Sequence, residues 1–469
     1  MFLWTQWYSA ISLLRPAFSH YATFVWFVVC AAGLSVRSDN LGVSSIVRAL
    51  SLDGKRDYYS LLRNIHSEAI DLDLLRSTWT RVVLKIFGDH IERVNSRPVL
   101  VADGKKIAKS GKKMPAVKSM FQESESNSKP TYIMGHSTQA ISILARAANT
   151  LFAVPLDIQI HEGVIFSNRD KRTLLDKLVS LVSGLKIAES CYLIADAYYA
   201  KGKIIKGMLE QGHDLVTRVR SDCVAYHPVK KSKGKLRRGR PKLYGKKVKL
   251  HNLFRSALKI NTLISPVYDE KDIPLRVRTI GLLWKPAGRL VRFVLVEHPT
   301  RGRLVLMSTD MTLEPVQIIR LYGLRFKIEL GFKQAAHIVG SYGYHFWMAG
   351  MKPTRRGAGN QYMHHETEAY RHAVRRKLRA FHVFMFMGVV TQGLMHYLSA
   401  CHTEPVWQCF KSWLRTIRHG VAPSEMVVKI ALRNELPEFL LVGAKNNPIA
   451  KFIVNHQAPD WGYFQDKAA

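Results

Sequence analysis

The sequence predicts an α/β protein with helical regions on either side of a central sheet, and three observations support this class. Apolar residues recur at spacings of three and four as far as about residue 96, which is the period of amphipathic helices. From Pro98 onward, short apolar runs bounded by Gly, Asn or Pro indicate buried strands instead. Helical spacing returns near Val316 and again from Trp347. Strands that alternate with helices along the middle of a chain are typical of the α/β class.

The middle of the chain predicts a defined series of elements. They are strands at 99–102, 132–145 and 151–160, a helix at 171–187, a strand at 192–195, a helix at about 204–209 and a strand at 214–226. Three strands, a helix, a strand, a helix and a strand is the order of an RNase H-like fold, in which the first and fourth strands are neighbours. We therefore expect an RNase H-like core.

The charge balance indicates a polyanionic partner. The 469 residues include 70 Lys and Arg against 35 Asp and Glu, for a formal net charge of +35. A folded core does not need that excess, and nucleic acid is the usual polyanion that neutralises it. Binding should weaken steeply with salt, because each phosphate contact releases counterions. A ribosomal-type or other generic basic protein is the alternative.

A β-rich insertion is expected to interrupt the core. Residues 230–249 form a basic loop, and strand-like runs follow at 275–283, 290–296 and 303–307. The expected domains are a helical N-terminal DNA-binding region at 1–96, the first part of the core at 97–228, the basic loop and insertion at 229–315, the final core helix at 316–345 and a helical C-terminal region at 346–469 for dimerisation or DNA end binding. A plain helical cap on the core is the alternative for the N-terminal region.

The cysteines and the most apolar stretch restrict the cellular location. The five cysteines have no C-x-x-C spacing, so neither a zinc site nor a disulfide framework is expected, and a reducing cytoplasm fits. The uncharged stretch 21–36 is shorter than the roughly 20 residues of a spanning helix. Only Arg15 precedes it, which argues against a signal peptide. We expect a buried helix and no membrane.

Two acids follow predicted buried strands. Asp103 comes directly after the strand at 99–102, and Asp196 directly after the strand at 192–195. Carboxylates at the ends of neighbouring strands, facing a crevice, are where α/β sheets place their chemistry. Taken singly, each acid would be read as a solvated turn residue.

The helix that follows the insertion carries a polar stripe. Tyr322, Arg325, Glu329 and Lys333 lie within an arc of about 80° around its axis. A tyrosine, two cations and a carboxylate do not form a core face, so the stripe is expected to point into the crevice that holds the two acids. A salt bridge within the helix is the alternative for Glu329.

These residue types suit phosphodiester chemistry with two metal ions. Asp103, Asp196 and Glu329 supply carboxylate oxygens, which Mg²⁺ prefers, and Mn²⁺ is expected to substitute for it. Two such ions about 3.5–4 Å apart activate a nucleophile and stabilise the leaving oxygen. Arg325 can grip a phosphate with its planar fork, Tyr322 can donate a hydrogen bond to another phosphate oxygen, and Lys333 adds positive charge.

The same residues carry a resemblance to a known family. Tyr322-x-x-Arg325-x-x-x-Glu329 resembles the Y-x-x-R-x-x-x-E signature of cut-and-paste DDE transposases of the insertion-sequence-four (IS-four) family. Asp103 and Asp196 also stand as in that family, and residues 123–136 are similar to its members. The resemblance covers about residues 95–345.

The resemblance implies a DNA transposase with a DDE catalytic core. It would bind double-stranded DNA at terminal inverted repeats, cleave both ends and join the 3′ hydroxyls to target DNA. A homodimer in the synaptic complex and a prokaryotic, nucleoid-associated cytoplasmic location are implied too. Two rivals stay open: a decayed or domesticated transposase that binds DNA without cutting it, and another two-metal nuclease. The three acids argue against the first, and joining of DNA ends would separate the second.

The chain departs from the family pattern at two positions. The family has a lysine seven residues after the glutamate, where this chain has Ala336, and Lys333 is the expected substitute one turn earlier. Trp284 is the candidate for the insertion tryptophan that stacks on a flipped base during hairpin formation. A core position within the insertion is the alternative for Trp284.

Several basic groups are candidates for DNA contact. Lys105, Lys106 and Lys109 follow the first acid and are expected to line the DNA path, although a solvated loop is the alternative. A second group, similar to an AT-hook core that lies in a narrow minor groove, consists of Arg237, Arg238, Arg240 and Lys242. A flexible basic linker is the alternative there. The basic stretch 355–379 would bind a transposon end, or would be an ordinary surface helix.

Overall fold

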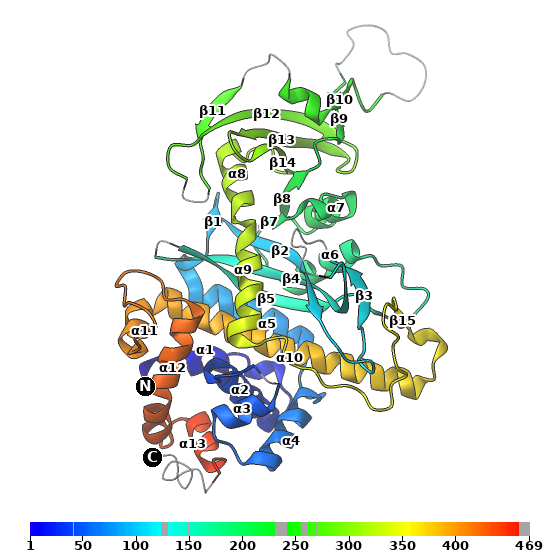
Figure 1. Ribbon diagram of the computed structural model, residues 1–469. Helices are drawn as coiled ribbons and strands as arrows, with labels where there is room; N and C mark the ends of the chain where they lie inside the picture. The colour runs from blue at the N-terminus through cyan, green and yellow to red at the C-terminus, as the bar shows by residue number, and fades with distance from the viewer. Residues whose placement is uncertain are drawn as a thin grey trace.

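A large mixed sheet forms the centre of the protein. The computed structural model describes residues 1–40, 42–122, 130–148, 150–229, 242–255, 260–267 and 270–458. The core strands are β2 (Arg97–Ala108), β4 (Tyr132–Ala147), β5 (Thr150–Ile160), β7 (Tyr192–Ala195) and β8 (Asp214–Val219). They lie side by side in the order β5-β4-β2-β7-β8 (Figure 1). Strand β4 runs antiparallel to β5 and β2, whereas β2, β7 and β8 are parallel.

This topology matches the order that the sequence predicts for an RNase H-like core. Helix α6 (Leu174–Gly184) comes between β5 and β7 in the chain. Helix α7 (Gly202–Glu210) connects β7 to its parallel neighbour β8. Two short strands complete this part: β1 (Arg93–Val94) pairs with β2, and β3 (Lys118–Phe121) pairs with β4. The first and fourth strands of the predicted series, β2 and β7, are neighbours as expected.

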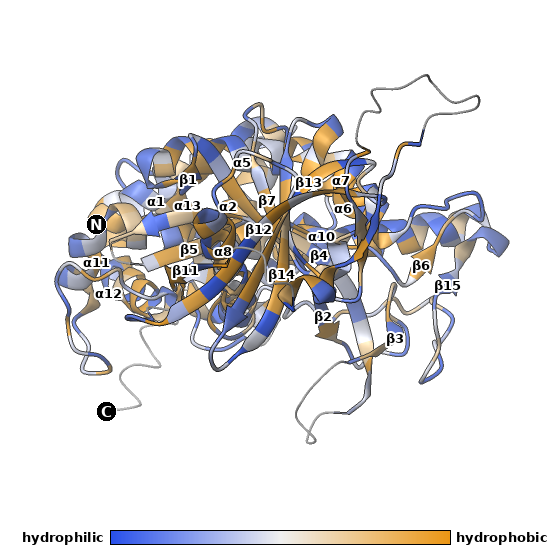
Figure 2. Cartoon of the chain, turned by 90° about the horizontal axis from the view of Figure 1, so that it is seen from above, coloured by the Kyte–Doolittle hydropathy of each residue, from blue (hydrophilic) through white to orange (hydrophobic). Residues whose placement is uncertain are grey.

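The strands after β8 prolong the same sheet. They are β9 (Val224–Tyr226), β10 (Lys247–Lys249), β11 (Asn261–Ile264), β12 (Pro274–Trp284), β13 (Arg289–His298) and β14 (Gly302–Ser308). Strand β14 pairs antiparallel with β8, and β13 and β12 follow outward. The single strand predicted at 214–226 is wrong, because a turn separates β8 from β9, and β9 pairs with β10 and β12. Figure 2 shows apolar residues along the middle of these strands and hydrophilic residues at the periphery.

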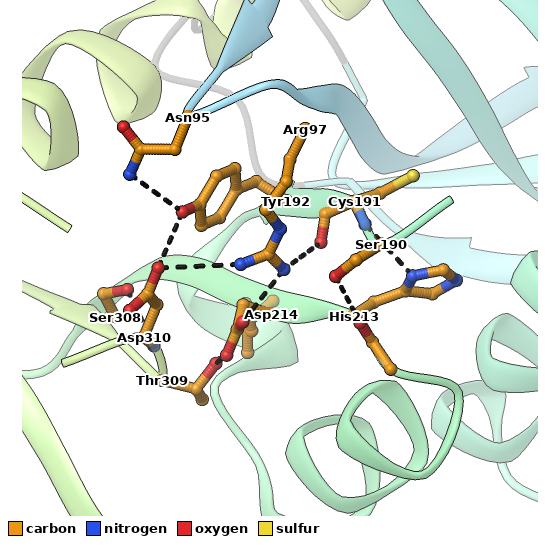
Figure 3. A network of polar contacts seen from close by, with 12 residues as sticks. Asn95, Arg97, Ser190, Cys191, Tyr192, His213, Asp214, Ser308, Thr309 and Asp310 are labelled. Atoms are coloured by element: carbon orange, nitrogen blue, oxygen red, sulfur yellow. Dashed lines mark hydrogen bonds and ion pairs between the residues drawn. The ribbon is translucent and has the colours of Figure 1, made fainter. Parts of the chain in front are cut away.

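A polar network fixes the edge of the sheet where the parallel strands begin (Figure 3). Arg97, the first residue of β2, donates hydrogen bonds to the Cys191 carbonyl (3.0 Å) and the Asp214 carboxylate (2.9 Å). Its guanidinium carbon lies 4.0 Å from the centre of the Tyr192 ring. The Tyr192 hydroxyl donates to Asp310, just after β14, at 2.6 Å. These contacts tie β2, β7, β8 and the end of β14 together and so support their register.

Helices from both ends of the chain pack together beneath the sheet (Figure 1). Those near the N-terminus are α1 (Phe2–Ser12), α2 (Tyr21–Val36), α3 (Ser44–Ala49), α4 (Gly54–Ile65) and α5 (Leu72–Phe87). Those near the C-terminus are α10 (Glu368–Cys401), α11 (Thr403–Phe410), α12 (Glu425–Gly443) and α13 (Pro448–Asn455). The Trp4 ring stacks on Phe439, and the Glu435 carboxylate accepts the Trp4 amide at 3.0 Å. The two helical regions therefore share one apolar core.

The two most apolar helices are largely buried. Twelve of the 16 residues of α2 are buried, as expected from the sequence. Helix α10 is long and apolar enough to cross a membrane by length and composition, but 83% of its most apolar window is buried inside the protein. Its apolar surface packs on α2, β5 and α12.

The predicted helix from residue 347 is wrong for its first part. Residues 347–367 are mostly irregular, and contain only β15 (Gln361–Tyr362), which pairs with β6 (Val164–Ile165), and a short 3₁₀ turn. Gly350, Pro353 and Gly357 break the helical pattern in this segment, because glycine is flexible and proline removes a backbone donor.

Candidate active site

Three acids converge from three elements. Parallel pairing between β2 and β7 ends at Ala102 and Ala195, so Asp103 and Asp196 come next to each other where β7 stops. Glu329 comes from α9 (Lys327–Gln334), which packs against β2 and β5. The sequence predicted that the strand would end just before Asp103, but β2 continues through it to Ala108 by pairing with β4. The acid nevertheless lies at an edge, because its neighbour β7 is shorter.

Arg325 bridges two of these acids. Its Nη1 lies 2.9 Å from Asp103 Oδ2, and its Nη2 lies 2.7 Å from Glu329 Oε1. Arg325 sits in a 3₁₀ turn (Leu324–Phe326) that separates α8 (Pro315–Gly323) from α9, so the helix expected from Val316 to Ala336 is interrupted. Tyr322 is half-buried beside Arg325. The polar stripe that the sequence predicts thus faces the two strand acids.

The pKa of Asp103 reflects a crowded carboxylate site. Burial raises the pKa of this carboxyl to about 6, and the charges of Glu329 and Asp196 act in the same direction. The Arg325 guanidinium and the Gly104 N–H, 2.7 Å from Asp103 Oδ1, oppose this shift. Asp103 and Asp196 are half-buried and Glu329 is exposed, and with Arg325 bridging two of the three carboxylates the site retains excess negative charge.

The donor set fits hard divalent metal ions. Carboxylate oxygens are the ligands that Mg²⁺ and Mn²⁺ prefer, and an added cation would relieve the repulsion around Asp103. Within the described residues, no three His, Cys, Asp or Glu side chains form a ready metal-binding group in this conformation. Arg325 instead neutralises Asp103 and Glu329. Lys333 is exposed and, among the described residues, pairs with none of the three acids.

Two residues that the sequence analysis missed lie close to the strand acids. Tyr199 lies in the 3₁₀ turn after Asp196, and its hydroxyl accepts a hydrogen bond from Gln139 at 2.9 Å. Burial raises the pKa of Tyr199, and the charges of Asp103 and Asp196 add to the effect. Its position three residues after an acid that ends a strand was the available signal. Gln139 had no such signal, because it reaches the site only through the pairing of β2 with β4.

Buried cations hold the carboxyl end of the helix that carries Glu329. Helix α9 continues into a π-helical turn (Ala335–Val339). Arg37, from the end of α2, donates to the carbonyls of Val339 (2.7 Å) and Gly340 (2.9 Å). Lys429 of α12 donates to the Ile338 carbonyl at 2.5 Å. Cations at the carboxyl end of a helix also complement its dipole, so both helical regions help to place α9.

Lys109 is also buried and bonded to backbone carbonyls, which corrects its expected role on the DNA path. Its side chain is buried, with 5% of the residue exposed. The ammonium donates to the carbonyls of Tyr342 (2.7 Å) and Tyr344 (2.8 Å). Burial lowers the pKa of Lys109 to about 7. A side chain enclosed in this way does not reach a phosphate.

The other expected DNA contacts have mixed outcomes. Lys106 and Lys242 are exposed and Lys105 is half-buried, so all three remain candidates. Arg237, Arg238 and Arg240 lie outside the described residues. Trp284 is only 3% exposed and packs edge-on against Phe293. The buried ring is not open to a base in this structure, so the core position that was the alternative for Trp284 is the one observed.

The comparisons with known proteins identify the family. The family described as DDE superfamily endonuclease matches residues 13–263, more than half of the 469 residues. The chain therefore belongs to the DDE superfamily of endonucleases, which generally use divalent metal ions. Asp103 and Asp196 lie inside the matched residues and Glu329 lies beyond them.

Two further comparisons were made, with curated proteins and with solved structures. No curated protein matches the chain. Among solved structures, the chain is similar to a piggyBac transposase in its synaptic complex with hairpin DNA, with a TM-score of 0.42 and 11% identity over 96% of this chain and 76% of that chain.

Proposed function

We propose that this protein is a transposase of a DNA insertion sequence that resembles the IS-four family. It would bind double-stranded DNA at terminal inverted repeats, cleave phosphodiesters there and join the 3′ hydroxyls to target DNA. The observation that carries the proposal is the convergence of Asp103, Asp196 and Glu329 from β2, the end of β7 and α9, with Arg325 between them. Membership of the endonuclease superfamily supports the reaction class.

The arrangement suggests a role for each side chain. Asp103, Asp196 and Glu329 would hold divalent metal ions, Mg²⁺ or Mn²⁺, which supply charge stabilisation at the phosphate under attack. Arg325 presents a planar guanidinium that can change from carboxylate to phosphate oxygens, because both are bidentate acceptors. The Tyr322 hydroxyl, beside Arg325, can donate to a further phosphate oxygen. Asp103 is half-buried, with 19% of its side chain exposed, so it remains accessible to a metal ion.

The finer family assignment rests on the Tyr322, Arg325 and Glu329 pattern. Arg325 and Glu329 form an i,i+4 pair on one helical face, as the signature requires. Lys333 is exposed and free to reach DNA as the substitute for the lysine that Ala336 replaces. Synapsis of two ends implies a homodimer, and the family implies a cytoplasmic, nucleoid-associated protein.

A cleavage and strand-transfer assay tests the proposal. Purified protein is mixed with Mg²⁺ and a labelled duplex that carries the presumed terminal repeat, and Glu329→Ala is run beside it. Glu210→Ala, an exposed glutamate on α7, is the matched control. We expect Mg²⁺-dependent cuts and joined products in the wild type and the control, and none in Glu329→Ala. Binding without cutting in any protein would favour the DNA-binding rival, and cuts without joined products would favour another nuclease.

A further inference from the structure

The connection between α11 and α12 exposes large apolar side chains. Residues 411–420, called here the 411–420 loop, include Trp413, which is 91% exposed, and the exposed Leu414 and Ile417. An indole in water is costly, since its apolar surface is among the largest of any side chain. Among the other described tryptophans, Trp4, Trp7, Trp79, Trp284 and Trp407 are buried, and Trp347 is 68% exposed. A surface of this kind marks a contact with another molecule.

The charges around Trp413 indicate the sign of that molecule. Lys411, Arg415 and Arg418 are exposed, and the 411–420 loop contains no Asp or Glu. Within the described part of the chain, the guanidinium groups of Arg415 and Arg418 take part in no hydrogen bond or ion pair. The loop thus presents unneutralised positive charge on both sides of an exposed ring.

The ends of the loop are held in place. Asn434 of α12 donates to the Phe410 carbonyl at 2.7 Å, where the loop begins. At the other end, the Glu404 carboxylate lies 2.7 Å from Nδ1 of His419 and accepts the Gly420 amide at 2.9 Å. Glu404 is therefore engaged in fixing the loop and does not neutralise its arginines. A fixed frame lowers the entropy lost when the tip binds a ligand.

A nucleic acid fits this surface better than the other occupants. In a twofold contact between two copies of the loop, Arg415 and Arg418 would face their own counterparts, and like charges disfavour that pairing. A lipid surface would bury the apolar side chains, but it offers no planar partner on which the indole can stack. A nucleic acid offers phosphates to the arginines and an aromatic face to the indole.

We propose that the 411–420 loop is a DNA-binding surface in which Trp413 stacks on a nucleobase that has left the base stack. Arg415 and Arg418 contact the phosphates on either side of that nucleotide. Stacking of this kind tolerates any sequence, since every base has a π face. The inference rests on the proposed function in taking DNA as the ligand, but it concerns binding and not cleavage.

Binding in the absence of metal tests the loop directly. The full chain is titrated into a labelled duplex in EDTA, with fluorescence anisotropy as the readout. One duplex is fully paired, and the other has a single unpaired 2-aminopurine. We expect Trp413→Ala to weaken binding to the second duplex by roughly 5- to 100-fold, with a smaller effect on the first. Trp413→Phe should keep most of the affinity, and the 2-aminopurine should be less quenched by Trp413→Ala than by the wild type.

The arginines and a matched control give independent readouts. The double variant Arg415→Gln, Arg418→Gln should weaken binding to both duplexes and reduce the salt slope by up to about 2, since each phosphate contact contributes about 0.9. Leu441→Ala removes an apolar side chain that is 78% exposed on α12, and should bind as the wild type does. Matching melting curves would show that the variants are folded.

The outcomes separate this inference from the proposed function. Wild-type binding by Trp413→Ala on the unpaired duplex would overturn the inference, and so would an effect of that variant only on self-association or on binding to anionic vesicles. If the loop variants behave as expected but no protein cuts DNA, only the proposed function fails. If cutting depends on Glu329 while Trp413→Ala binds normally, only the inference fails.

Discussion

Arg37 offers the sharpest test of how the chain places the helix that carries Glu329. Its guanidinium is fully buried and makes five hydrogen bonds, to the carbonyls of Val339, Gly340 and Gly42 and to the Ser45 hydroxyl. In Arg37→Met the Gly42 carbonyl still accepts a hydrogen bond from the Ser45 hydroxyl, and the Gly340 carbonyl still accepts one from the Gly343 amide. The Val339 carbonyl loses both of its Arg37 donors.

The expected cost follows from this accounting. A buried carbonyl without a donor costs about 1–3 kcal/mol, and the two weakened carbonyls add about 1 kcal/mol each, so Arg37→Met should cost roughly 3–5 kcal/mol. Arg37→Lys keeps the charge but not the two-point grip on Val339 and Gly340, and should cost about half as much. Because the π-helical turn that continues α9 ends at this point, the loss should appear as easier local opening of residues 335–345.

Hydrogen exchange measured by mass spectrometry reads that opening. Amides of residues 335–345 should exchange about 100-fold faster or more in Arg37→Met, which corresponds to the lower end of the expected cost. Arg379→Met is the matched control, because Arg379 also donates to backbone carbonyls, those of Ser67 and Ile70, but does not touch this segment. Exchange in Arg37→Met within about threefold of the wild type would refute the reasoning.

Three further outcomes are expected. Trp284→Ala should lower the melting temperature, because removing a buried ring costs about 3–5 kcal/mol of stability, and Trp284→Phe should cost less. A Trp284→Ala variant that melts like the wild type but has lost DNA affinity would contradict the core role. Arg325→Lys should lose most of the cleavage activity, because one ammonium cannot span Asp103 and Glu329 as the guanidinium does. Its DNA affinity, measured by anisotropy, should stay within a few-fold of the wild type, and unchanged cleavage would contradict the bridging role. Burial lowers the pKa of Lys109 to about 7, below its unfolded value, so the unfolded chain binds an extra proton between about pH 7 and 10 and stability should rise with pH in that window. The melting temperature of the wild type relative to Lys109→Met should therefore increase from pH 7 to pH 9, and a constant difference would exclude a depressed pKa.

Much of the site was predictable because its signals are local. Asp103 and Asp196 follow short apolar runs, and a strand is recognised from four or five consecutive residues. Tyr322, Arg325 and Glu329 share a face because helical geometry alone brings residues three, four and seven apart into one stripe. The 3₁₀ turn at Arg325 changes the helix without moving these residues to different faces.

The failures concern residues whose surroundings come from distant segments. Lys109 has the sequence context of an exposed basic segment, yet residues more than 230 positions later supply the carbonyls that accept its hydrogen bonds. Trp284 was expected to meet DNA, yet its ring is buried and packs against Phe293. The local sequence does not indicate which face of a strand a later segment of the chain will cover.

The sequence by itself determined the basic character of the chain, the order of the core strands, the acids that follow two of them and the polar face around Glu329. Each of these depends on residue type and on spacings within a few turns or strands. Only the tertiary structure decided that β14 joins β8, that the short β7 leaves Asp103 at an edge, and that Arg37 holds the end of α9. Those outcomes depend on which surfaces meet when segments hundreds of residues apart are packed together, and that information is spread over the whole chain.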